Sequence, residues 1–282
     1  MFLKKLGIGA CGLAGAAALW MASAGAALAA PKAWEMDLQP AVSPVMTDIH
    51  DFDRLLIYII TAICLFVLAL LLWIMVRYNS RANPTPSKTS HNTLLEVAWT
   101  IVPVIVLVFI AIPSFRLLYF EGTIPPHPDL TIEAVGKQWY WTYAYPDAGK
   151  MQFDSQYLQD ADAAKAHEPR LLGVDNPVYV PVNKVVQIET TGADVIHSWA
   201  VPAFGVKMDA VPGRINHTWF KATKLGTYYG ECSELCGAGH AFMPIEVKVV
   251  SDADFQKWLA AAKKQYNAKG SLDSTRMAAL TK

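Results

Sequence analysis

An uninterrupted apolar run, Leu55–Val76, is the feature that most constrains how this chain can fold. The run contains no charged residue and is bracketed by Arg54 and Arg77. An α-helix rises about 1.5 Å per residue, so the run would be about 33 Å long as a helix, which is enough to cross a lipid bilayer. The pattern predicts a transmembrane helix at residues 54–77.

A second apolar run, Val97–Phe115, follows closely. It contains Pro103 and Pro113, which a membrane helix tolerates because lipid leaves the backbone few alternatives to helical hydrogen bonding. The pattern predicts another transmembrane helix at residues 94–117. Together the two runs predict a helical hairpin that anchors the rest of the chain.

Charged residues predict how the hairpin is oriented. The connection, residues 78–93, carries Arg81 and Lys88 and no acid. Residues 30–53 are instead rich in acidic residues and have a single lysine, Lys32. Basic loops stay on the cytoplasmic side of a membrane. We therefore expect a cytoplasmic connection, and we expect residues 30–53 and the chain after the second helix to lie on the outer side of the membrane.

The first segment, residues 1–29, is typical of a cleaved secretory signal peptide. Lys4 and Lys5 precede a stretch of Ala, Gly and Leu, and Ala27-Leu28-Ala29 fits the small residues required at a cleavage site. A retained additional transmembrane helix is the alternative.

The pattern changes after the second helix. The whole chain is 53% hydrophobic and 17% charged, with 24 basic and 24 acidic residues, so no net charge attracts it to nucleic acid. Residues 118–251 consist of short runs rich in Val, Ile, Thr and aromatic residues between Gly, Pro and Asn turns, which is typical of an all-β Greek-key barrel or sandwich. Residues 252–282 are predicted to form a C-terminal helix and tail.

Soft metal ligands gather near the end of the β region, in the segment ECSELCGAGHAFMP. This segment presents Cys232, Cys236, His240 and Met243. A further histidine, His197, lies in the earlier motif DVIHSW.

Several interpretations of these residues are open. Two external cysteines can form a disulfide, and two cysteines with His197 and His240 can hold a structural zinc. Single-copper electron-transfer sites use one thiolate, so this set has one too many. Two thiolates can instead bridge two copper ions, each completed by a histidine and by a weak ligand, either Met243 or a backbone carbonyl such as that of Glu234. Ordinary core packing is the remaining alternative, and Met243 and the membrane anchor favour copper over zinc.

Several motifs of the chain resemble one family. The motifs LLEVAWTIVPV, GKQWYWTYAYP, DVIHSWAVPAFGVKMDAVPGR and GTYYGECSELCGAGHAFMPIEV are similar to those of cytochrome c oxidase subunit II, and the resemblance runs from the first apolar helix to about residue 250. It implies a cupredoxin-like domain that holds a binuclear copper centre, CuA. The implied copper ligands are His197, Cys232, Glu234 through its carbonyl, Cys236, His240 and Met243.

The resemblance also implies a surface for cytochrome c. Trp139 is the implied point of electron uptake and is expected to be exposed, whereas Tyr140 or Trp141 packs in the sheet. Asp175 and Asp194 match acids that the family uses to dock the basic face of cytochrome c. Ordinary solvated carboxylates are the alternative for both aspartates.

Two glutamates have roles implied only by the resemblance. The side chain of Glu234 is implied to reach a Mg²⁺ ion at the boundary with subunit I, and a hard oxygen ligand suits that ion. Glu96 is implied to take up protons for a channel in subunit I; a carboxylate that merely lies at the membrane interface is the alternative.

The implied function is that of an electron-transfer subunit in an oxidase. The chain would accept electrons from cytochrome c and pass them to the haem and copper centres of subunit I, where oxygen is reduced to water with proton translocation. The implied partners are cytochrome c and subunits I and III. A copper-handling or assembly module, which would bind a labile copper ion and pass it on, is the alternative from another class.

Overall fold

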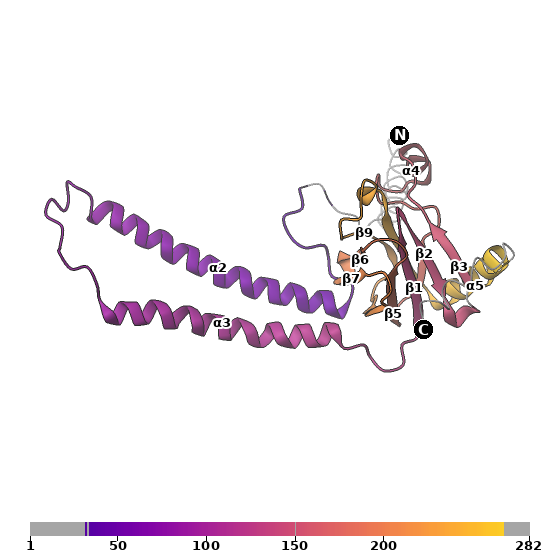
Figure 1. Cartoon of the computed structure of the whole chain (residues 1–282), viewed down its shortest axis with the longest axis horizontal. Coiled ribbons are helices and arrows are strands. Elements are labelled where there is room, and N and C mark those ends of the chain that lie inside the picture. The colour runs from indigo at the N-terminus through magenta and orange to yellow at the C-terminus, as the bar shows by residue number, and fades with distance from the viewer. Residues whose placement is uncertain (1–31, 33, 150, 268–282) are drawn as a thin grey trace, which may run out of the picture. The chain divides into compact units, whose positions relative to one another are not determined.

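The computed structural model describes residue 32, residues 34–149 and residues 151–267. The chain divides into two compact units. Thr47–Thr123 forms a helical unit, and the described residues before and after it form a β-sheet unit (Figure 1). The predicted signal peptide, residues 1–29, lies outside the described residues.

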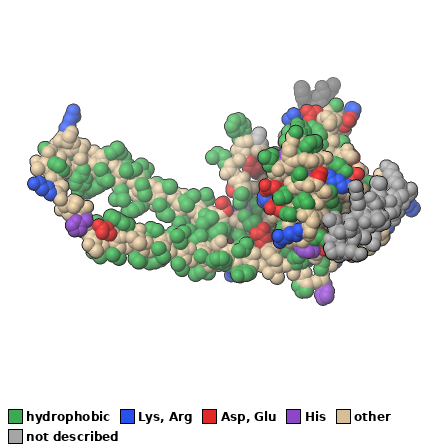
Figure 2. Space-filling model, viewed as in Figure 1, with side chains coloured by type: hydrophobic (Ala, Val, Ile, Leu, Met, Phe, Trp, Pro, Cys, Tyr) green, Lys and Arg blue, Asp and Glu red, His purple; other side chains and the backbone are tan. Residues whose placement is uncertain are grey.

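The helical unit is made of two long helices, α2 (Pro44–Arg77) and α3 (Thr93–Gly122). They run antiparallel, joined by the loop between them (Figure 1). Both are long and apolar enough to cross a membrane by length and composition. Hydrophobic side chains cover them along their length, with Lys and Arg at the loop (Figure 2). The predicted transmembrane hairpin is therefore confirmed.

Helix α2 begins earlier than the predicted span 54–77. The Ser43 hydroxyl accepts a hydrogen bond from the Met46 backbone N–H at 3.0 Å, which caps a helix whose first residue is Pro44. The same hydroxyl donates to the Phe204 carbonyl at 2.6 Å. The residues just before the helical unit are thus part of the β-sheet unit.

Helix α3 begins and ends beyond the predicted span 94–117. The Asn92 side chain caps its start by accepting hydrogen bonds from the backbone N–H groups of its first turn. Pro103 and Pro113 both lie inside the helix.

The β-sheet unit consists of two sheets of five strands each. The first has the order β3-β2-β1-β5-β8, with strands β1 (Leu130–Lys137), β2 (Tyr140–Tyr145), β3 (Met151–Ser155), β5 (Val185–Gly192) and β8 (Asn216–Lys221). The second has the order β4-β10-β9-β6-β7, with strands β4 (Val178–Pro181), β6 (His197–Val201), β7 (Val206–Ala210), β9 (Gly226–Cys232) and β10 (Pro244–Val250). The parallel pairs β1 with β5 and β4 with β10 require crossovers, as in a Greek key.

The core lies between the two sheets. Burial alternates residue by residue along β1, whereas every residue of β6 is buried. The rings of Phe204 and Phe220 stack at 4.3 Å between centroids, and the Trp199 indole donates a hydrogen bond to the Tyr143 hydroxyl at 3.2 Å. Aromatic rings therefore fill much of the interior, and the polar atoms of Trp199 and Tyr143 bond to each other there.

Two short elements complete the unit. The predicted C-terminal helix is α5 (Asp252–Asn267), and its Trp258 ring stacks on Tyr179 at 4.7 Å. Helix α4 (Asp160–Ala166) interrupts the strands between β3 and β4. The predicted all-β fold of this domain is confirmed, but its predicted start at residue 118 is too early because α3 continues to Gly122.

Candidate metal centre

The predicted soft ligands meet at one end of the second sheet. His197 is the first residue of β6 and Cys232 is the last residue of β9. The short helix η3 (His240–Phe242) precedes Met243 and β10. One ligand atom from each of His197, Cys232 and Cys236 lies within 4.8 Å of the others, and all three residues are buried.

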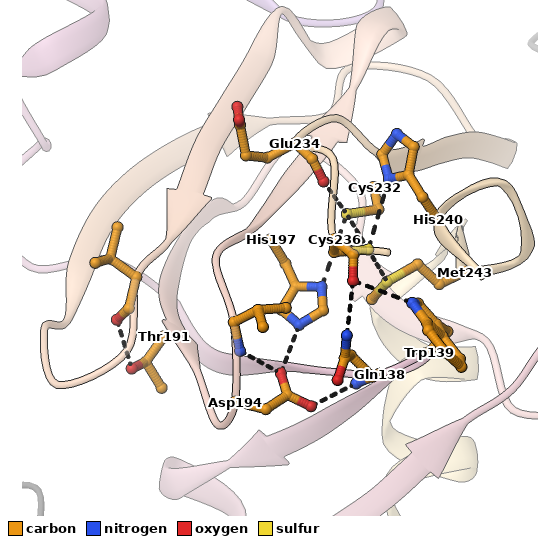
Figure 3. Close-up of polar contacts among 12 residues, drawn as sticks. Gln138, Trp139, Thr191, Asp194, His197, Cys232, Glu234, Cys236, His240 and Met243 are labelled. Atoms are coloured by element: carbon orange, nitrogen blue, oxygen red, sulfur yellow. Dashed lines mark hydrogen bonds and ion pairs between the residues drawn. The ribbon is translucent and has the colours of Figure 1, made fainter. Parts of the chain in front are cut away.

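The two sulfur atoms lie at the centre of the ligand set (Figure 3). They are 3.9 Å apart, and both thiols are free. Cys232 Sγ lies 3.9 Å from His197 Nδ1 and 3.4 Å from the Glu234 carbonyl oxygen. Each sulfur therefore has its own neighbours.

The second sulfur has a matching environment. Cys236 Sγ lies 3.6 Å from His240 Nδ1 and 3.7 Å from Met243 Sδ. Each thiol thus faces one imidazole and one weak ligand, and the thiols face each other. Thiolate, imidazole and thioether donors of this kind suit a soft metal ion such as copper.

Backbone hydrogen bonds close the loop between Cys232 and Met243, which we call the ligand loop. The Cys232 N–H donates to the Met243 carbonyl at 3.2 Å, and the Ser233 N–H donates to the Ser198 carbonyl at 3.0 Å. Within the loop Gly237 has a φ of 118°, which is a conformation that glycine adopts without strain. Cys236 and His240 therefore lie in a loop whose two ends are hydrogen-bonded to the sheet.

The orientation of His197 is set by Asp194. Its Nε2 lies 2.8 Å from the Asp194 carboxylate, which leaves Nδ1 facing the sulfur. The backbone N–H groups of Val195 and Gln138 also donate to this carboxylate, each at 2.7 Å. Carboxylates that hold a ligating histidine in this way fix its tautomer and ring direction.

Ionisation of these groups follows from their contacts. Burial works against the charged form of Asp194, but hydrogen bonds from His197, Gln138 and Val195 outweigh burial and lower the pKa of Asp194. Burial also favours the neutral form of His197, yet its contacts with Cys232 and Asp194 raise the pKa of His197.

The two thiols ionise unequally. Burial opposes both thiolates, but contact with His197 and nearby backbone lowers the pKa of Cys232 to about 7. For Cys236, burial and then the charge of Cys232 raise the pKa above its ordinary value. A metal ion that binds both thiols as thiolates must displace the protons that they still carry.

Trp139 is the exposed member of the aromatic run, as expected. It is 38% exposed, whereas Trp141 is fully buried. Its indole Nε1 donates to the Cys236 carbonyl at 3.2 Å. A Cβ atom on Gly239 would meet the indole ring, so the ring lies directly against the ligand loop.

Other predicted residues lie outside this cluster. Asp175 is exposed and accepts a hydrogen bond from the Gln156 N–H at 2.7 Å. The Glu234 side chain is exposed and points away from the sulfur atoms (Figure 3). Glu96 lies in the first turn of α3, in the helical unit. The roles implied for these three residues stay predictions.

Two further residues, Gln138 and Gly136, shape the site but are not among those that the sequence alone singles out. The amide of Gln138 donates to the Cys236 carbonyl at 2.8 Å. Gly136 lies under the His197 ring, where a Cβ atom would come 2.6 Å from the ring. Both lie in or next to the predicted strand before Trp139, but the partners that give them a role come from distant parts of the chain.

The fold and the site together define a class of protein: a membrane-anchored cupredoxin-like domain with a thiolate-rich metal centre. Residues 31–117 match the family model for the transmembrane domain of cytochrome c oxidase subunit II, and residues 130–250 match the model for its periplasmic domain. The chain belongs to the cytochrome c oxidase subunit II family.

The two cytochrome c oxidase subunit 2 sequences described next agree with this assignment. "Probable cytochrome c oxidase subunit 2" of Rickettsia bellii (strain RML369-C) is 51% identical over 234 residues, which are 83% of this chain and 86% of that protein. "Cytochrome c oxidase subunit 2" of Cereibacter sphaeroides is 42% identical over 273 residues, covering 88% and 89% of the two chains. The solved periplasmic domain of subunit II of cytochrome oxidase from Bradyrhizobium japonicum is 60% identical, covers 51% of this chain and 99% of that one, and gives a TM-score of 0.48.

Membership in the family makes the chain a subunit of cytochrome c oxidase and a membrane protein. In a chain of this family, the cluster of His197, Cys232 and Cys236 supports copper as the metal. The predicted identity and the two-part architecture are confirmed.

Proposed function

We propose that the chain accepts electrons from cytochrome c at a binuclear copper centre, CuA, and passes them to the haem and copper centres of subunit I. The observation that carries this proposal is the paired environment of the two thiols. Each thiol faces one imidazole and one weak ligand. A single-copper electron-transfer site would need only one thiolate.

The proposed copper ligands are His197, Cys232, Glu234 through its carbonyl, Cys236, His240 and Met243. When bound there, a pair of copper ions would take up and release one electron at a time, with the charge spread over both sulfur atoms. The chain's own residues keep the geometry constant: Asp194 holds His197, and the hydrogen bond from Cys232 to Met243 closes the loop. Fixed ligands suit electron transfer because little has to move when the charge changes.

Trp139 is the proposed point of electron uptake. Its exposed ring can contact a docked protein, and its indole N–H is bonded to the peptide that carries the Cys236 ligand. A short bonded path therefore leads from the surface to a sulfur atom. Asp175 and Asp194 are the proposed acidic contacts for the basic face of cytochrome c, where complementary charge mainly speeds association.

Two further roles belong to the assembled oxidase. The exposed Glu234 carboxylate is proposed to bind Mg²⁺ at the boundary with subunit I. Glu96 is proposed to deliver protons to a channel in that subunit. Subunit III is a further proposed partner, and oxygen is reduced to water in subunit I with proton translocation.

The proposed location is a bacterial inner membrane. The helices α2 and α3 would cross it, with the connection on the cytoplasmic side and the β-sheet unit in the periplasm. Residues 1–29 would be removed as a signal peptide. The basic residues of the connection and the acids of residues 30–53 support this orientation.

Electron paramagnetic resonance of the copper-loaded full chain tests the proposal. One unpaired electron shared equally by two copper nuclei gives a hyperfine pattern that differs from that of a single nucleus. A shared-electron pattern, with two copper ions per chain by metal analysis, is the expected result. A labile single copper ion would instead favour a copper-handling module, and bound zinc would favour a structural site.

A further inference from the structure

Gln138 connects the turn between β1 and β2 to the loop that carries Cys236. It lies between the end of β1 and the start of β2, directly before Trp139. Its side-chain Nε2 donates to the Cys236 carbonyl at 2.8 Å (Figure 3). A Cβ atom on Gly237 would lie 3.1 Å from that same Nε2, so the amide packs closely against the loop.

The Cys236 carbonyl receives two donors. Gln138 Nε2 and Trp139 Nε1 both bond to it, at 2.8 and 3.2 Å. A carbonyl oxygen has two lone pairs, so these donors saturate it and fix the direction of the peptide plane. Because this peptide belongs to a proposed copper ligand, its direction constrains where the Cys236 sulfur lies.

The backbone of Gln138 acts on the other side of the centre. Its N–H donates to Asp194 at 2.7 Å, and the other oxygen of that carboxylate bonds His197 Nε2 at 2.8 Å. Gln138 therefore contacts Cys236 in the loop after β9 and the carboxylate that supports His197 at the start of β6.

We infer that Gln138 is a positioning residue for the metal centre, which holds the Cys236 peptide through its side chain and the Asp194–His197 pair through its backbone. This inference rests on the proposed function, since it concerns the copper-loaded state. It gives Gln138 a role distinct from surface contact with a partner.

Substitution can remove the side-chain hydrogen bond of Gln138 while leaving its backbone hydrogen bond to Asp194 in place. Gln138→Leu keeps the backbone N–H and the approximate side-chain size but removes the donor to Cys236. Gln138→Glu keeps the shape and polarity but places an acceptor oxygen opposite the carbonyl. Gln187→Leu, in β5 of the same sheet, is the matched control because Gln187 bonds Glu189 rather than the ligand loop.

The structure predicts a local effect in Gln138→Leu. Losing one hydrogen bond to the loop should increase the rate of copper loss to a chelator by about two- to tenfold. Donors near a thiolate stabilise the more negative, reduced form, so the reduction potential should shift downward. The couplings of the Cys236 β-protons, measured by electron-nuclear double resonance, should change more than those of the His197 ring.

These measurements use the full chain in detergent, with thermal unfolding as a check on folding. If Gln138→Leu does not fold, Gln138→Glu carries the same test, with the same downward shift expected. An unchanged potential with unchanged Cys236 couplings, or an equal change in Gln187→Leu, would overturn the inference. A wild-type chain without the two-copper signal would overturn the proposed function itself, so the two failures are distinguishable.

Discussion

The imidazole of His197 is restrained from several directions. Asp194 bonds its Nε2, Gly136 leaves room beneath the ring, and the Trp141 ring meets it edge-on at 6.0 Å. None of these restraints comes from a metal ligand. At the scale of single residues, ligand geometry is therefore set by neighbours of the ligands.

Replacing Asp194 with Asn tests the support of His197. The change weakens the bond that orients the ring and removes the negative charge beside it. We expect copper affinity to fall by about tenfold or more, the usual effect of losing such a partner. Chelator competition on the full chain measures it, and Asp175→Asn, an exposed acid without ligand contacts, should leave the affinity unchanged. Equal affinities in Asp194→Asn and wild type would contradict this role.

Gly136→Ala tests the space under the same ring. The added Cβ would lie 2.6 Å from a His197 ring atom, which is closer than van der Waals contact allows. The ring must shift, so the variant should bind substoichiometric copper while the β-sheet unit remains folded. Gly122→Ala is the control, because a Cβ there meets nothing within 4 Å. Full copper content in Gly136→Ala by metal analysis would show that the ring adapts.

At the scale of elements, a cluster of charged side chains joins the segment after α4 to strands β9 and β10. Lys248 of β10 lies 3.0 Å from Glu246 and 3.5 Å from Glu168. The Tyr229 hydroxyl of β9 donates to Glu168 at 2.5 Å, and Glu246 accepts from the Val174 N–H at 3.1 Å. Glu246 is only 1% exposed, so its charge is costly to bury.

This cluster gives a pH-dependent stability. Burial raises the pKa of Glu246, with Lys248 opposing it. A carboxyl whose pKa is raised by folding stabilises the fold below its unfolded pKa, and that gain is lost as pH rises through the raised value. Glu246→Gln, which stays neutral, should therefore gain thermal stability over wild type as pH rises from the ordinary titration range of a carboxyl group to neutral pH. Thermal midpoints of both chains measure the difference, and a constant difference across that range would contradict the explanation.

The elements themselves were largely predictable from local pattern. The apolar runs specified α2 and α3, and the alternation in β1 specified a strand with one buried face. Helix α2 begins at Pro44, earlier than the apolar run predicts. Its first residues, among them Val45, lie outside that run and are buried, so hydropathy alone does not mark the start of the helix. A local pattern cannot show a cap whose hydroxyl also bonds Phe204.

At the scale of the whole molecule, the membrane anchor and the candidate metal site belong to different units. The helical unit carries Glu96 and supplies the apolar surface of a membrane anchor, and the β-sheet unit carries the metal centre and Trp139. Substitutions that test the proposed proton uptake and the proposed electron uptake should therefore have separable effects.

Trp139→Val tests electron uptake in the β-sheet unit. The change removes the exposed ring and its bond to the Cys236 peptide but no copper ligand. We expect electron transfer from cytochrome c to slow by about tenfold or more, as for an aromatic hot spot of an interface. Stopped-flow reduction of the assembled oxidase measures it, with copper content as the control. Unchanged rates would refute the role of Trp139.

Glu96→Gln tests proton uptake in the helical unit. The substitution keeps the side-chain size at the first turn of α3 but removes its ionisable group. Oxidase turnover should fall while reduction of copper by cytochrome c is unchanged. Intact turnover would leave Glu96 as a carboxylate that only lies at the membrane interface.

The sequence by itself determined the two apolar helices, the all-β fold and a group of candidate metal ligands between Cys232 and Met243, because apolar runs, alternation and residue spacing are local properties of the chain. Only the tertiary structure decided how the ligands are held. His197 meets Cys232 across 35 positions and Gln138 meets Cys236 across 98. Such contacts depend on which strands become neighbours, and strand order is fixed by packing of the whole β-sheet unit rather than by any local pattern.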